Sequence, residues 1–126
     1  MTETSKLSAP DRRRMAERAV ESIVHQDEKV LVQVRCGRGH HVAMVLDTQV
    51  GPVFRSMTGP HAHGSRDFVD AGHGIHHHGT PYVDLLAGGD LVDDALPACC
   101  ECGPHTLSRA RLQQAIADRQ RTVQLP

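Results

Sequence analysis

The apolar positions of the chain begin with a helical period. A single stripe recurs every three to four residues and consists of Ala16, Ala19, Val20, Ile23 and Val24. The preceding stretch Ser8-Ala9-Pro10-Asp11 has the residue types of a helix N-terminus, with a capping hydroxyl, a proline in the first turn and an acidic side chain near the positive end of the dipole. The pattern predicts a helix over residues 8–26, after a frayed tail over residues 1–7.

The pattern then becomes typical of β-strands. Residues 30–35 and 42–46 are rich in β-branched side chains, and a glycine-containing turn separates them. The pair Gly51-Pro52 marks a further turn before a third short strand at residues 53–55. Residues 29–56 are therefore predicted to form antiparallel strands, with the first turn at one tip of the sheet.

Residues 57–94 differ in character, because glycine, histidine and aspartate dominate them. Only Phe68-Val69 and residues 82–86 offer apolar anchors to a core. We interpret this segment as a long surface insertion between two turns of the sheet.

A helical period returns near the C-terminus at Leu112, Ala115 and Ile116. It predicts a helix over residues 106–120, capped by Thr106 or Ser108, and residues 122–125 favour one more short strand. The predicted fold class is α+β, as one domain over residues 1–126: a small antiparallel sheet with an N-terminal helix, a Gly/His-rich insertion and a C-terminal helix.

Composition indicates a thin core. Hydrophobic residues make up 39% of the 126 positions, but the aromatic side chains are limited to Phe54, Phe68 and Tyr82. A metal crosslink is useful to such a chain, because structural zinc contributes about 10 to 16 kcal/mol while small domains are stable by only about 5 to 15 kcal/mol.

Charge and hydropathy restrict the classes of partner. The formal net charge of −1 is unlike that of a dedicated nucleic-acid binder, although arginines near the C-terminus keep such a contact open as a minor hypothesis: Arg109, Arg111, Arg119 and Arg121. No apolar run is long enough for a membrane span, and no signal peptide is recognisable. We expect a cytoplasmic protein with no membrane partner, in which clustered cysteines are metal ligands or reactive thiols rather than disulfides.

The candidate chemistry lies in two glycine-containing turns. Cys99 and Cys102, followed by Gly103, have the spacing of a knuckle that offers two thiolates to one ion, and Cys36 with His40 forms a second half-site. The spacing predicts a metal site of Cys36, His40, Cys99 and Cys102. His41 can replace His40 and Cys100 can replace Cys99, since spacing does not separate neighbours. Buried cysteines without a metal and thiol redox chemistry are the alternatives.

These two turns resemble those of zinc ribbons, in which two knuckles clamp one structural zinc between β-hairpins. The second knuckle matches the pattern, whereas the first has Gly39 where the pattern has a ligand. The resemblance covers residues 30–56 and 95–104. It implies a structural Zn²⁺ and a binding or adaptor role with a protein partner.

The insertion carries a second group of imidazoles, with Asp67 and Asp70 between them: His61, His63, His73, His76, His77 and His78. This group makes a metal-dependent hydrolase or a metal-handling protein the alternative function. The templates of metallohydrolases and zinc deaminases match incompletely, and phosphate loops and nucleophile elbows are missing from the sequence. No catalytic residues are therefore assigned.

Overall fold

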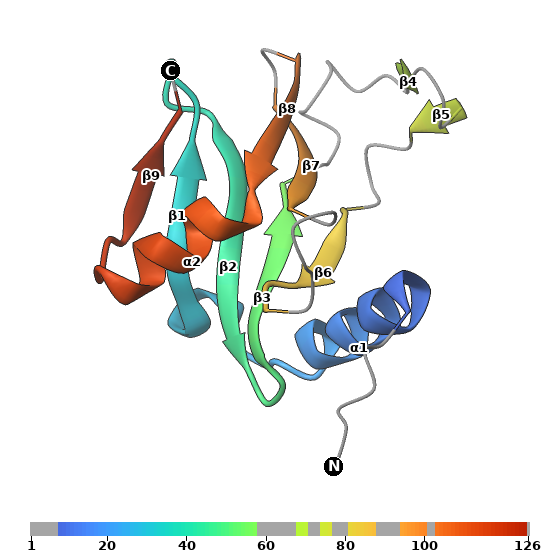
Figure 1. Ribbon diagram of the computed structural model, residues 1–126, viewed down its shortest axis with the longest axis vertical. Helices are drawn as coiled ribbons and strands as arrows, with labels where there is room; N and C mark the ends of the chain where they lie inside the picture. Colours follow the sequence, from blue (N-terminus) through green and yellow to red (C-terminus); the bar gives the residue numbers. More distant parts are fainter. Residues whose placement is uncertain are drawn as a thin grey trace.

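The computed structural model describes residues 8–57, 68–70, 74–76, 81–87, 94–100 and 103–125, without the side chains of 68–70, 74–76, 99, 103 and 104. Within these ranges the chain has an α+β fold, as the sequence predicts (Figure 1). In chain order the elements are α1 (Ala9–Glu21), the 3-10 helix η1 (Gln26–Lys29), β1 (Val30–Arg35), β2 (His41–Thr48), β3 (Gly51–Ser56), β4 (Phe68–Asp70), β5 (Gly74–His76), β6 (Val83–Leu85), β7 (Ala95–Cys100), β8 (Gly103–Ser108), α2 (Arg109–Ala117) and β9 (Thr122–Gln124).

The main sheet has five strands in the order β6-β3-β2-β1-β9. The three central strands form the predicted antiparallel meander, and β6 adds to it antiparallel to β3. The last strand, β9, pairs parallel with β1 and makes the sheet mixed. Val34 pairs with Ala43 while Arg35 pairs with His41, so Val42 is the additional residue of a β-bulge. This bulge lies directly beside the turn that joins β1 to β2.

The two faces of the main sheet are covered by different elements. Because successive strand residues point to opposite faces, Val45 and Phe54 belong to one core cluster while Leu46 and Val53 belong to another. The first cluster also contains apolar residues of α2, β7 and β8, and the second contains residues of α1. Figure 1 shows α2 lying across β1 and β2, with the β7–β8 hairpin on the same side.

Helix α1 starts where the sequence predicts and ends earlier. The Ser8 Oγ accepts a hydrogen bond from the Asp11 N–H at 3.2 Å, which caps the helix. The helix ends at Glu21 instead of residue 26, because the chain turns at Ser22 and the β-branched pair Ile23-Val24 favours helix weakly. Ile23 still packs against the α1 core cluster, whereas Val24 is 85% exposed.

Helix α2 begins later than predicted, because β8 continues through Ser108. The Ser108 Oγ caps the helix by accepting the Arg111 N–H at 3.1 Å. Asp94 adds a second cap, since its carboxylate accepts the Ala110 N–H at 2.9 Å. Hydrogen bonds from the Ala110 backbone and from Ser108 lower the pKa of the Asp94 carboxyl.

The region predicted as an insertion contributes to the sheets at two places. Val83–Leu85 becomes the edge strand β6 of the main sheet, and β4 pairs antiparallel with β5 in a separate small sheet. None of the helices in the described ranges has the length and apolar character that crossing a bilayer requires.

Candidate metal centre

The first half of the centre is the turn from β1 to β2. Its hydrogen bonds run from the Cys36 N–H to the His40 carbonyl at 3.0 Å and from the Gly39 N–H to the Cys36 carbonyl at 2.8 Å. Gly39 adopts a φ of +84°, which favours glycine because other residues are strained there. The Arg38 N–H also points at the Cys36 Sγ, at 3.4 Å, and thereby favours negative charge on this sulfur. The turn is therefore arranged around the sulfur.

The second half is the hairpin of β7 and β8. Leu96, Ala98 and Cys100 alternate along β7 and are all buried, so one face of the strand packs on the core. This alternation directs the Cys100 sulfur to the same side as the core residues. β7 lies against β2 and β3, which brings Cys100 at the end of this strand to the β1–β2 turn.

Three potential ligands of a metal ion meet where these halves come together: Cys36, His40 and Cys100. Their ligand atoms all lie within 4.8 Å of one another, and the Cys36 Sγ is 3.4 Å from the His40 Nδ1. With zinc–sulfur and zinc–nitrogen bonds of about 2.3 and 2.0 Å, ligand atoms of a tetrahedral ion lie about 3.5 to 3.8 Å apart. Both cysteines are 2% exposed and His40 is half-buried. This group could hold a metal ion after small side-chain shifts.

The structure brings some of the predicted metal ligands together and does not describe others. The structure brings Cys36 and His40 together, whereas His41 is exposed at the start of β2. Cys100, the predicted alternative to Cys99, is the described cysteine of the second half. The side chain of Cys99 and all of Cys102 lie outside the described part of the chain, so their role as ligands stays a prediction.

His105 was not singled out from the sequence. Its Nε2 lies 3.1 Å from the Cys100 Sγ, within reach of a hydrogen bond to this sulfur. In the β7–β8 register His105 pairs with Ala98, two residues before Cys100. This contact could have been predicted only if β8 had been recognised as a strand that pairs with β7. The stretch Gly-Pro-His-Thr-Leu-Ser has no clear strand pattern, so the sequence did not indicate it.

The histidine group of the insertion lies outside the described residues, except for the backbone of β4 and β5. The hypothesis of a second metal site or a hydrolase centre on His61, His63, His73 and His76 to His78 is therefore not tested by the structure.

A buried charge cluster occupies a different part of the described molecule. The Arg12 Nε donates to the Asp84 Oδ1 at 2.8 Å, the Arg109 Nη2 donates to the Asp84 Oδ2 at 3.0 Å, and the Tyr82 hydroxyl donates to the same oxygen at 3.1 Å. Burial alone would raise the pKa of the Asp84 carboxyl, but its bonds to the two guanidinium groups outweigh burial and lower the pKa. Burial and the Asp84 carboxylate raise the pKa of Tyr82. The carboxylate therefore joins α1, β6 and α2.

This cluster corrects the hypothesis that Arg109 contacts nucleic acid. Arg109 opens α2, where its positive charge opposes the helix dipole and therefore needs a nearby anion. The structure supplies Asp84, and Arg109 is 3% exposed. A residue buried to this degree is not available to a phosphate backbone.

No family model matches this chain, and no curated protein or solved structure shows significant similarity to it.

Proposed function

We propose that the chain is a binding or adaptor module for a protein partner, stabilised by one structural Zn²⁺ in a zinc-ribbon-like centre. In this proposal Cys36, His40 and Cys100 are three ligands, and the fourth comes from the second knuckle. The observation that carries it is the meeting of three ligand atoms from remote hairpins within 4.8 Å.

The types of ligand support zinc. Two thiolates and one imidazole are soft or borderline ligands, whereas Mg²⁺ and Ca²⁺ require oxygen ligands. Tetrahedral sites with sulfur and nitrogen ligands from two turns are the common form of structural zinc. The Arg38 N–H bond to the Cys36 Sγ supports this interpretation, because the ligand has to be a thiolate.

Burial supports a structural ion over a catalytic one. A catalytic zinc keeps one position open to water or substrate, whereas a structural zinc has four protein ligands. Both described sulfurs are nearly inaccessible to solvent. A closed centre leaves no position for substrate, and interaction through the surface is then the role that remains.

We assign the fourth ligand to Cys102, which lies two residues after Cys100 and is followed by Gly103. Cys99, which the sequence predicts as a ligand beside Cys102, is the alternative. His105 is a structural rival because of its 3.1 Å approach to the Cys100 Sγ, and as a non-ligand it would orient this sulfur by a hydrogen bond.

Metal analysis of protein purified without a His-tag tests the centre. We expect one zinc per chain by native mass spectrometry, with loss of this zinc in Cys36→Ser and Cys100→Ser. His40→Ala should weaken zinc binding by more than the roughly 10- to 100-fold that loss of an outer-shell partner costs, while the matched variant His41→Ala should bind as the wild type does. Wild-type protein without zinc after refolding in its presence would contradict the proposal.

Cobalt substitution separates the candidates for the fourth ligand. The thiolate-to-cobalt charge-transfer band grows with the number of sulfur ligands, so with cobalt in saturating excess it should fall in Cys102→Ser by about one third, from three sulfur ligands to two. Cys99→Ser and His105→Ala should keep the band intensity. A reduced band in Cys99→Ser alone would assign the fourth ligand to Cys99. A changed tetrahedral spectrum in His105→Ala alone would assign it to His105.

A further inference from the structure

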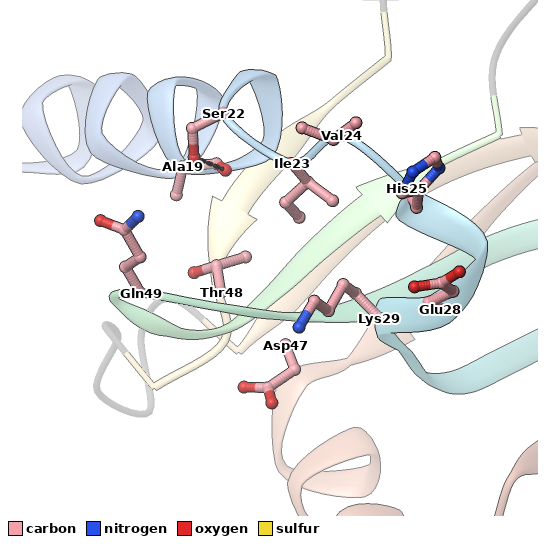
Figure 2. A pocket seen from close by; sticks show the side chains of 10 residues that line it. All are labelled: Ala19, Ser22, Ile23, Val24, His25, Glu28, Lys29, Asp47, Thr48 and Gln49. Atoms are coloured by element: carbon pink, nitrogen blue, oxygen red, sulfur yellow. Dashed lines mark hydrogen bonds between the residues drawn. The ribbon is translucent and has the colours of Figure 1, made fainter.

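A shallow groove runs along α1 at the end of the molecule that includes the β2–β3 turn. It consists of two hollows of about 400 Å³ each, which share Ala19, Ser22 and Gln49 in the middle. Figure 2 shows the hollow near η1, with Ala19 of α1 and Ser22 just after the helix on one side, and Thr48 and Gln49 on the other. The groove contains none of the proposed metal ligands.

The large apolar side chains that are exposed on the described surface all line this groove. Met15 and Val50 line one hollow and are 37% and 42% exposed, and Val24 lines the other and is 85% exposed. Single exposed apolar residues are ordinary, but a gathering along one groove is typical of an interaction site.

The two ends of the groove carry opposite charge. The hollow at the start of α1 is lined by Arg14 and Arg18 against Asp11, so one positive charge is left over. The hollow at η1 is lined by Glu28 and Asp47 against Lys29, so one negative charge is left over. Arg14 already pairs with Asp11 on the same helix, which leaves Arg18 as the excess cation.

We propose that this groove is the contact surface between two copies of the chain. In a two-fold symmetric interface the same patch of both copies forms the contact, and the two patches run in opposite directions. With the axis near Ala19 and Ser22, the positive end of one copy faces the negative end of the other, and the apolar side chains lie between them. Both axis residues are small and thus permit close approach of the two α1 helices.

A second copy of the chain is chosen as the occupant because the charges of this groove are complementary to those of the same groove turned end to end. An acidic or a basic peptide would match one end of the groove and be repelled by the other. The inference does not rest on the zinc centre, which lies among other residues.

Sedimentation of the full-length, zinc-loaded chain tests the proposal. We expect a concentration-dependent species of twice the 13.8 kDa chain mass. Val24→Glu should weaken the association at least 10-fold, and because Val24 is 85% exposed the substitution should leave the fold intact. Circular dichroism and zinc content serve as controls for the fold.

Charge reversal gives the decisive experiment. Arg18→Glu makes both ends negative and Asp47→Lys makes both ends positive, so each variant alone should dimerise at least 10-fold more weakly. An equimolar mixture of the two variants should recover the dimer, because opposite ends then meet again. A Val24→Glu chain should not recover in any mixture.

Three results would overturn the inference. They are a wild-type chain that stays monomeric at several hundred micromolar, a dimer unaffected by Val24→Glu, and a mixture of the charge variants that associates no better than each variant alone. Because zinc content is measured on the same samples, a monomeric but zinc-loaded chain rejects the dimer and leaves the metal centre standing.

Discussion

Asp84 is the residue on which the described charge network depends. Its carboxylate is fully buried and bonds to the guanidinium groups of Arg12 and Arg109. Asp84→Asn removes the carboxylate that these two buried guanidinium groups share, so we expect a loss of about 3 to 5 kcal/mol in the free energy of unfolding. Urea unfolding measures this loss. Asp27→Asn, at an exposed position of η1, is the control and should change stability by about 0.5 kcal/mol or less.

The same carboxylate gives a pH dependence with a defined sign. The pKa of Asp84 in the folded chain is below its ordinary value of 3.8, so its stabilising effect is complete above pH 3.8 and is lost as pH falls through the lowered pKa. The difference in unfolding free energy between wild type and Asp84→Asn should therefore shrink below pH 3.8. A difference that stays constant down to pH 2 would show that the lowered pKa has no energetic effect.

Residue patterns predicted some of these details and not others. The Ser8 and Ser108 caps follow from local sequence, because a capping side chain bonds to its own helix. The partner of Arg109 is 25 positions away on a different element, and no local rule selects Asp84 among the acidic residues. Spacing likewise left Cys99 and Cys100 equivalent, and strand alternation orients Cys100 only once β7 is known.

At the scale of elements, two turns provide a matched pair. Gly39 in the β1–β2 turn and Gly51 in the β2–β3 turn have φ values of +84° and +97°, and an added Cβ would contact nothing within 4 Å at either place. Gly39→Ala and Gly51→Ala should each cost about 1 to 2 kcal/mol through backbone strain alone. Only Gly39→Ala should also weaken zinc binding, as isothermal titration with a competing chelator can measure. Equal zinc affinity in both variants would show that the geometry of the β1–β2 turn does not contribute to zinc binding.

The elements themselves were predictable to different degrees. The α1 helix and the meander follow from strong periodicity and clear turn residues. β8 was missed because Pro104, His105 and Thr106 have no alternating apolar pattern, and its pairing with β7 determines the strand. β6 was predicted only as an apolar anchor, since three residues are too few to define a period.

At the scale of the molecule, the proposed ion crosslinks elements on one face of the main sheet and makes no contact with the other face. Cys36 and Cys100 belong to the core cluster shared by α2 and the β7–β8 hairpin, while α1 packs on the opposite face. Chelation should therefore speed amide hydrogen exchange first in β7, β8 and the β1–β2 turn, with α1 and β3 remaining protected longer. Hydrogen exchange with mass spectrometry checks this order, and loss of protection at one rate everywhere would contradict it.

The parallel pairing of β9 with β1 affects how the chain folds as it is synthesised. β9 hydrogen-bonds to β1 from the far end of the sequence, and the Gln124 side chain donates to the Cys36 carbonyl. The sheet cannot be completed around this turn until residues beyond 121 have left the ribosome, and contacts of such large sequence separation form slowly. A nascent chain therefore passes through a stage in which Cys36 has been synthesised while Cys100 and β9 have not, and metal capture is expected only after both have emerged.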